Sequence, residues 1–115
     1  MPEKIFEALH NITAVPTAHL EGKKFVFLSN EDTATMLTQF AYGSFEPGEK
    51  CSEHVHSTME ECFFFIKGTG RYVVGGIKYD LVPGSFLRIP AGVPHNLEAT
   101  GTGKLEFVYF GIATK

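Results

Sequence analysis

The chain of 115 residues is 43% hydrophobic and 20% charged, a balance typical of one soluble globular domain rather than of a disordered segment. Its net charge of −3 lacks the basic excess that binding to a phosphate backbone requires, so we expect no nucleic acid partner. The longest apolar run, Cys62 to Ile66, is too short to cross a bilayer, and no signal-peptide region follows Met1. We therefore expect a cytoplasmic protein without a membrane partner.

The composition favours an all-β fold. The chain has eleven Phe, four Tyr, twelve Gly and six Pro, and no window sustains an apolar stripe of helical period. Gly75 and Gly76 predict a two-residue hairpin turn, because glycine readily adopts the positive φ that such turns need. The expected strands, each bounded by turn-forming residues, are 24–28, 35–45, 51–56, 61–67, 70–74, 77–81, 85–89, 95–99 and 105–112.

Residues 1–20 are expected to form an N-terminal arm or edge strand, and residues 21–115 a single domain. The apolar residues between Ile5 and Ile12 have the spacing of a short helical stripe, but Pro16 ends any such helix. A short helix and an edge strand are therefore both open for this segment.

Three histidines and a glutamate are the candidate functional residues: His54, His56, Glu61 and His95. Imidazole nitrogens and carboxylate oxygens hold divalent first-row metals. His54 and His56 stand at i and i+2 on the expected strand 51–56, so their side chains should share one face. A Pro-containing turn at 90–94 then aims His95 back towards them. We expect these residues to form a metal site.

The spacing of these residues resembles the two-motif signature of the cupin superfamily. The first motif reads Gly48, five residues, His54, one residue, His56, four residues, Glu61, six residues and Gly68, and the second reads Gly84, five residues, Pro90, Ala91, Gly92, two residues and His95. The chain departs from the family at Ala99, where cupins commonly carry Asn. The ligand positions are unaffected by this departure.

The resemblance implies a small single-domain, type-2 cupin. Such a protein is a double-stranded β-helix, or jelly-roll barrel, of two antiparallel sheets. The resemblance implies a divalent metal near one mouth of the barrel, held by His54, His56, Glu61 and His95, and the ion would be Zn, Ni, Fe, Mn or Cu. Glu60 is a rival ligand to Glu61, and the family spacing selects Glu61.

Four further residues are candidates for a substrate pocket. Phe63 and Phe65 share the face of Glu61 on an alternating strand, and they either flank the metal or simply fill the barrel. Tyr42 belongs to one of two rows of strand 35–45, and the sequence does not indicate which row faces inward. Arg88 would bind an anionic substrate if it pointed inward, although an exposed arginine is the commoner case.

Other side chains are expected to be structural. Cys51 and Cys62 should be reduced, and Cys51 is either an inert core thiol or a residue near the barrel mouth. His10 and His19 stand outside both motifs, and we expect no metal-binding role for them.

Two functions remain open on this evidence. One is an enzyme that acts on a small polar metabolite, by isomerase or epimerase chemistry with the metal as Lewis acid, or by dioxygenase chemistry. The other is a non-catalytic, metal-dependent module that binds a sugar or another small molecule. A plainly structural barrel would require an empty or degenerate site. Because both sheet faces carry aromatic residues, we also expect a homodimer.

Overall fold

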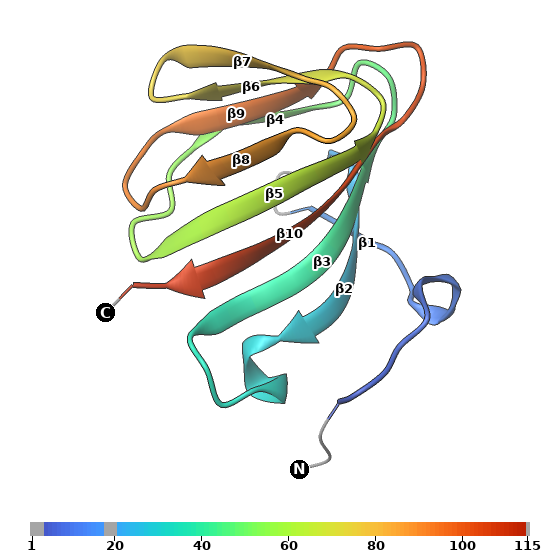
Figure 1. The fold of residues 1–115 in the computed structure, drawn as a ribbon, viewed down its shortest axis with the longest axis vertical. Coiled ribbons are helices and arrows are strands. Elements are labelled where there is room, and N and C mark those ends of the chain that lie inside the picture. Colours follow the sequence, from blue (N-terminus) through green and yellow to red (C-terminus); the bar gives the residue numbers. More distant parts are fainter. Residues whose placement is uncertain (1–3, 18–20, 115) are drawn as a thin grey trace.

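The computed structural model describes residues 4–17 and 21–114 as two antiparallel sheets that face each other across one core (Figure 1). The six-stranded sheet has the order β1 (Val15–Pro16), β2 (Lys23–Ser29), β3 (Leu37–Phe45), β10 (Leu105–Ala113), β5 (Met59–Lys67) and β8 (Phe86–Ile89). The four-stranded sheet has the order β4 (Lys50–His54), β9 (His95–Ala99), β6 (Gly70–Val74) and β7 (Ile77–Leu81).

The all-β, jelly-roll prediction is confirmed. Strands β6, β7 and β9 have the expected bounds, and the other predicted strands differ by one or two residues at their ends. Gly75 and Gly76 adopt φ of 58° and 81°, so the turn between β6 and β7 has the two positive values predicted for it.

One strand prediction is wrong in a way that matters for the site. Strand β4 ends at His54, and its pairing with β9 shifts register between Cys51 and His54. An irregularity of this kind bends a strand and interrupts its ladder. His56 therefore lies in the connection after β4 and does not share a strand face with His54.

The N-terminal segment follows the edge of the six-stranded sheet. It contains a single 3-10 turn, η1 (Leu9–Asn11), and the two-residue strand β1, in which Val15 pairs with Lys24 and Pro16 with Lys23. A proline is tolerated at an edge strand because its missing N–H costs no ladder bond there. His19, for which we expected no metal-binding role, lies outside the described residues.

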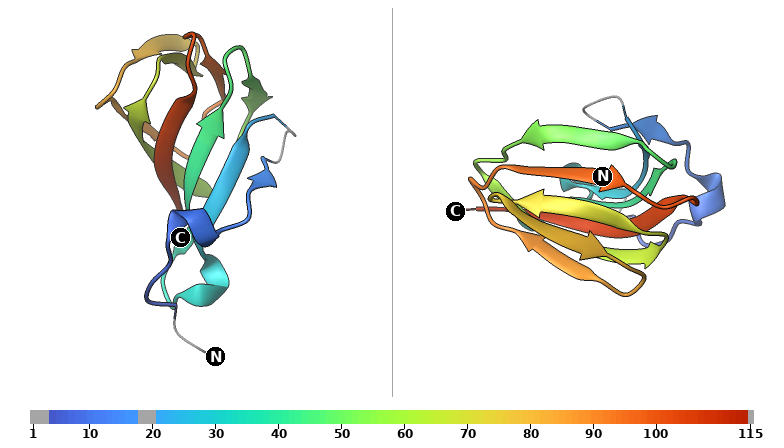
Figure 2. Two further views of the ribbon diagram at one scale, coloured as in Figure 1. Left: turned by 90° about the vertical axis from the view of Figure 1, so that its right-hand side faces the viewer. Right: turned by 90° about the horizontal axis from the view of Figure 1, so that it is seen from above.

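The core lies between the two sheets, which Figure 2 shows as separate layers. The six-stranded sheet contributes alternate residues of β3, β5, β8 and β10 to this core, and the four-stranded sheet contributes residues of β4, β6, β7 and β9. Fourteen buried hydrophobic residues form one contiguous cluster. None of the helices within the described residues is both long and apolar enough to span a membrane.

Candidate metal centre

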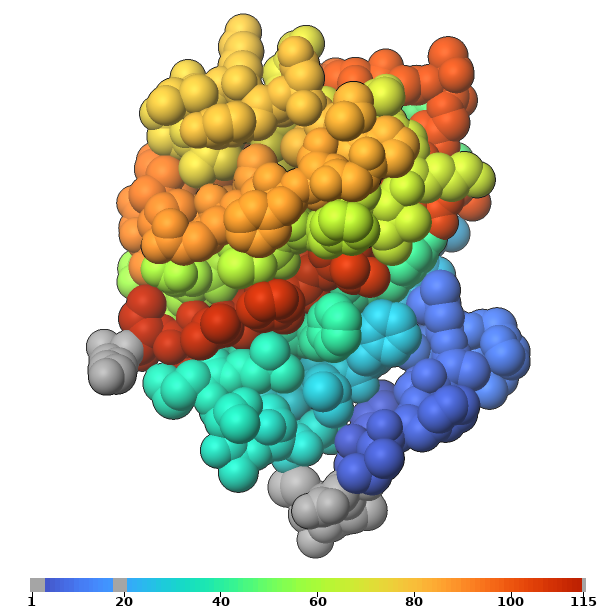
Figure 3. Space-filling view, viewed as in Figure 1, coloured from blue at the N-terminus to red at the C-terminus, as the bar shows by residue number. Residues whose placement is uncertain are grey.

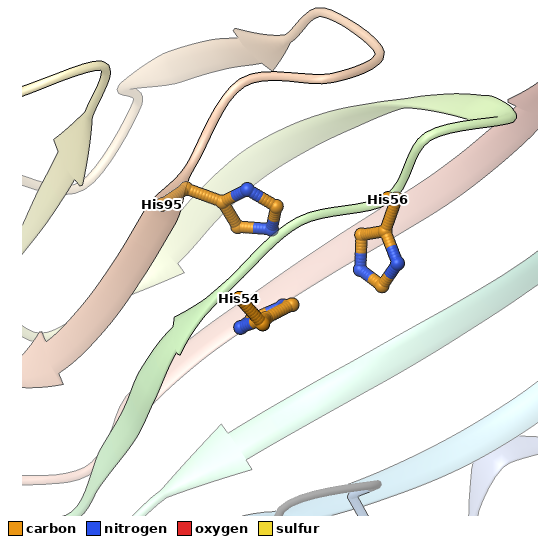
Figure 4. A group of neighbouring side chains, drawn as sticks. All are labelled: His54, His56 and His95. Carbon is orange, nitrogen blue, oxygen red and sulfur yellow. The ribbon is translucent and has the colours of Figure 1, made fainter.

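His54, His56 and His95 meet at one end of the core, although they come from two separate parts of the chain. His54 closes β4, His56 lies in the connection that follows, and His95 opens β9 opposite His54 (Figure 4). The ring centroids of His54 and His95 are 4.2 Å apart, and those of His54 and His56 are 4.8 Å apart. One ligand nitrogen from each of the three histidines lies within 4.8 Å of the others, so the group could hold a metal ion.

Backbone carbonyls orient two of these imidazoles. His54 Nδ1 is 2.8 Å from the carbonyl oxygen of Ser52, and His95 Nδ1 is 2.9 Å from the carbonyl oxygen of Val93. Because a carbonyl oxygen only accepts hydrogen bonds, both Nδ1 atoms must donate a proton. In the neutral imidazole, Nε2 then carries the lone pair, which is the tautomer that a metal requires.

Glu61 brings a carboxylate to the histidines from the opposite sheet. Its Oε1 lies 3.5 Å from His56 Nε2 and 3.8 Å from His95 Nε2. Glu61 is only 8% exposed. Burial raises the pKa of this carboxyl to about 7, while the charge of Lys24 acts to lower it. Three imidazoles and one carboxylate are a donor set that fits a divalent first-row metal.

The neighbouring glutamate has the opposite environment. Glu60 points to the outer face of β5, where both of its oxygens accept hydrogen bonds of 3.1 Å from Arg88. This bond lowers the pKa of Glu60. The structure therefore places Glu61, and not Glu60, beside the histidines.

A cavity of about 210 Å³ opens beside the histidine cluster. Its walls come from both sheets and combine polar and apolar side chains. The residues that line it are Thr17, Lys23, Lys24, Gln39, Gly43, Phe45, Cys51, His54, His56, Met59, Glu61, Phe63, Tyr72, Leu97, Phe107 and Tyr109.

Of the two predicted pocket phenylalanines, Phe63 lines the cavity and Phe65 does not. The Phe63 ring stacks on Tyr109 at a centroid distance of 5.0 Å and on Phe65 at 5.9 Å. Phe65 is fully buried. Phe65 thus belongs to the packed core behind the cavity wall, whereas Phe63 forms part of that wall.

The structure corrects the two other pocket predictions. Tyr42 lies on the outer face of β3, where its ring contacts Phe25, and the opposite row with Ala41 and Gly43 is the buried one. Arg88 lies on the outer face of β8, paired with Glu60. Neither side chain lines the cavity.

Gly43 shapes the cavity by having no side chain. Its position is buried on the inner face of β3, and a Cβ built there would collide with the aromatic ring of Phe107. Both residues line the cavity. The Phe107 ring can occupy its present place only because residue 43 is glycine.

Several cavity residues were not among the sequence-based candidates: Lys24, Gln39, Met59 and Tyr72. Alternation places residues of a strand on two faces without indicating which face is inward. In β2 the register pairs Lys24 with the inward-facing Gly43, so Lys24 shares that face. The sequence of β2 alone does not indicate which of its two faces points inward.

The two cysteines are free thiols, as expected. Cys51 lines the cavity, and burial raises the pKa of its thiol to about 11. The thiol is therefore protonated at neutral pH and is a poor nucleophile or metal ligand. His10, on the 3-10 turn, is exposed and outside the histidine cluster.

Comparison with known proteins supports the fold. A family model described as Cupin domain matches residues 41–111. No curated protein sequence matches the chain significantly. Among solved structures, a predicted oxalate decarboxylase from Thermotoga maritima superposes with a TM-score of 0.87 at 22% identity, covering 95% of this chain and 99% of that one.

Two further solved structures have the same fold. KdgF from Halomonas sp. has a TM-score of 0.78 at 17% identity, and covers 94% of this chain and 93% of its own. A sugar phosphate isomerase of the cupin superfamily from Silicibacter pomeroyi has a TM-score of 0.76 at 20% identity, with 93% and 74% coverage. At these identities the likeness shows the fold alone.

Proposed function

The chain belongs to the Cupin domain family, and we propose that it is a metal-dependent enzyme acting on a small polar metabolite. The observation that carries this proposal is the convergence of three imidazoles and one buried carboxylate beside a cavity. Proteins bury a carboxylate at a cost, and a bound cation is one partner that offsets the cost.

In this proposal His54, His56, Glu61 and His95 hold the metal. A divalent ion held there would supply Lewis-acid polarisation of a substrate carbonyl or hydroxyl, and four protein ligands would leave positions open for substrate. The carbonyl of Val93 orients the ring of His95, and metal-binding histidines are commonly oriented by such a carbonyl.

The remaining walls of the cavity serve binding and the exclusion of water. Phe63, Leu97 and Phe107 are buried and apolar. They lower the local dielectric, which strengthens every charge interaction inside the cavity. Isomerase, epimerase and dioxygenase chemistry are all compatible with such a site. The sugar phosphate isomerase from Silicibacter pomeroyi has a similar structure and is named for isomerase chemistry.

A non-catalytic binding module is the second candidate, and one observation favours it. Among the described residues that line the cavity, Glu61 is the only carboxylate, and the proposal gives it to the metal. Burial raises the pKa of Tyr72 and Tyr109 well above the ordinary value, so both phenols stay protonated and neither is a ready base.

Metal analysis followed by an activity screen tests the proposal. Protein purified without a nickel column should take up about one divalent ion per chain. The reconstituted forms with Mn, Fe, Co, Ni, Cu and Zn are then assayed with and without dioxygen against sugar phosphates, enediols and keto acids. Turnover that requires the ion and is lost in His56→Ala supports the enzyme. Ligand binding without turnover supports the binding module, and failure to bind any ion contradicts both.

We also propose a homodimer formed through the outer face of the six-stranded sheet. The strand registers place Phe25, Tyr42, Val108, Phe64 and Phe86 side by side in one row across β2, β3, β10, β5 and β8. Figure 3 looks onto this face, where the five strands follow one another as bands of colour. Phe64 and Phe86 are 49% and 67% exposed. A contiguous apolar row of this kind supports burial against a second copy.

A further inference from the structure

A lysine and a glutamine form a polar pair in the cavity wall, on strands that carry none of the three histidines. Lys24 of β2 lies opposite Gly43 of β3, and its Nζ donates a hydrogen bond of 3.2 Å to Oε1 of Gln39 on the same strand as Gly43. Lys24 and Gln39 line the same cavity as the histidine cluster. Both side chains are partly buried.

We propose that Lys24 and Gln39 bind a carboxylate group of a small anionic metabolite whose other end reaches His54, His56 and Glu61. This inference rests on the proposed function, because the second end of the ligand is held by the metal. It names the substrate class that the proposed function leaves open.

The ion-pair pattern of the protein supports this role. Five of the eight other cationic side chains among the described residues lie within 4.0 Å of a carboxylate, and they are Lys4, Lys67, Arg71, Arg88 and Lys104. The remaining three, Lys23, Lys50 and Lys78, are exposed, whereas Lys24 is partly buried. Lys24 has no carboxylate within that distance among the described residues, and its partner is the neutral Gln39 amide. A partly buried ammonium beside a neutral group can take an anionic partner without giving up an existing ion pair.

The charge balance of the cavity points the same way. Its lining includes Lys23 and Lys24 but only one carboxylate, Glu61, within the described residues. A bound divalent cation would add two positive charges, so the loaded cavity favours an anionic ligand.

The donors suit a carboxylate better than a phosphate. Lys24 keeps two N–H donors beyond the one that it gives to Gln39, and the Gln39 amide keeps its NH₂ group. Phosphate sites commonly use the bidentate fork of arginine. Both arginines of this chain, Arg71 and Arg88, are instead paired with carboxylates on exposed surfaces.

The size of the cavity limits the ligand. Pockets for drug-sized molecules have volumes of roughly 300–1,000 Å³, and this cavity has about 210 Å³. The ligand is thus a short molecule.

Calorimetric titration with defined probes tests the assignment. The probes are oxalate, malonate and succinate, the neutral malonamide, and inorganic phosphate, each added to protein loaded with Mn²⁺ and to metal-free protein. The variants are Lys24→Met, Lys24→Arg and Gln39→Leu, with Lys78→Met on the exposed face of β7 as the matched control. Circular dichroism and metal content are measured for every variant.

We expect at least one dicarboxylate to bind the loaded wild type and malonamide to bind much more weakly. Lys24→Met should weaken that dicarboxylate by about 10- to 100-fold, as expected for a lost charge-assisted hydrogen bond. Gln39→Leu should weaken it by a smaller factor, and Lys24→Arg should restore much of the affinity. Metal content should be the same in all variants, because Lys24 is not a ligand.

The inference is overturned if Lys24→Met binds every dicarboxylate as tightly as the wild type, or if no dicarboxylate binds the loaded wild type. Tighter binding of phosphate than of any dicarboxylate would overturn the carboxylate class. Failure of the wild type to bind Mn²⁺ or another ion would instead contradict the proposed function. In that case the metal-free titrations still decide whether Lys24 binds carboxylates.

Discussion

The two faces of β5 carry similar residues into opposite environments. The inner face presents Glu61, Phe63 and Phe65, all buried, and the outer face presents Glu60 and Phe64, which are partly or largely exposed. Burial raises the pKa of Glu61 to about 7, whereas a hydrogen bond from Arg88 lowers the pKa of Glu60. The pKa values of two adjacent glutamates on one strand are therefore shifted in opposite directions.

On β5, the face to which a side chain points therefore decides its environment, and the residue type alone does not. Successive side chains of a strand point to opposite faces. The glutamate on the inner face is desolvated and lies 3.5 Å from a histidine nitrogen, so its carboxylate can bind a cation. A glutamate on the outer face stays solvated and forms a surface ion pair, which contributes little to stability.

The largest effect should come from the aromatic residues of the two faces. Phe65 is 0% exposed and Phe64 is 49% exposed. Phe65→Ala should lower the free energy of unfolding by about 3–5 kcal/mol, because it leaves a cavity in the core. Phe64→Ala should lower it by about 1 kcal/mol or less. Urea denaturation at low protein concentration measures both, and equal losses would contradict the assignment of faces.

The glutamates provide the next test. Glu61→Gln should weaken metal binding by about 100-fold or more, since loss of a supporting group alone costs roughly 10- to 100-fold. Glu60→Gln is the matched control, one residue away on the other face, and should leave the affinity unchanged. Competition against a chromogenic chelator gives both dissociation constants. Equal affinities for wild type and Glu61→Gln would remove Glu61 from the ligand set.

The apolar row on the outer face predicts the oligomeric state. Phe86→Asp places a charge on the most exposed residue of the row, at its β8 end, and we expect it to raise the dimer dissociation constant by at least about tenfold. Ile77→Asp, on an exposed position of the other sheet, should leave the dimer intact. Light scattering coupled to size exclusion reads out the mass, and a wild-type monomer at micromolar concentration would refute the proposed dimer.

The smallest effect concerns the Glu60–Arg88 pair. Because the pKa of Glu60 is lowered in the folded protein, its contribution to stability is present above the ordinary value of 4.5 and is lost as the pH falls through the folded value. The wild type should thus be slightly more stable than Glu60→Gln at neutral pH, and the difference should shrink in acid. Thermal unfolding of both proteins over a pH series measures it. If the stability difference between wild type and Glu60→Gln grew in acid, the ion pair would not be its source.

Much of the fold was predictable because the residues that end its strands and form its turns can be recognised locally in the sequence. Glycines at the tight turns, such as Gly75 and Gly76, mark the ends of strands, and the turn residues around β6, β7 and β9 fixed their bounds. Alternation on β5 allowed only one of Glu60 and Glu61 to face the interior, and the family spacing selected Glu61. Turn residues and motif spacing can both be read along the chain.

The predictions that failed depend on tertiary packing. His56 lies beyond β4 because the pairing of β4 with β9 shifts register, which no residue of β4 signals. Tyr42 points outward because the smaller row of β3, with Ala41 and Gly43, faces the aromatic residues of β10 and β5. Arg88 points outward because Leu87 and Ile89 occupy the inward positions of β8. Lys24 lines the cavity because β2 pairs it with the inward-facing Gly43, and Gln39 lines it from the same row of β3 as Ala41 and Gly43.

Gly43 has a consequence for how this protein could change over evolutionary time. Since a Cβ at this position would collide with the Phe107 ring, the smallest possible substitution, to alanine, must displace an aromatic side chain. That ring forms part of the cavity wall, so its displacement alters the space available to a ligand while every proposed metal ligand is retained. A single nucleotide change in one glycine codon is therefore enough to reshape the cavity on the same barrel.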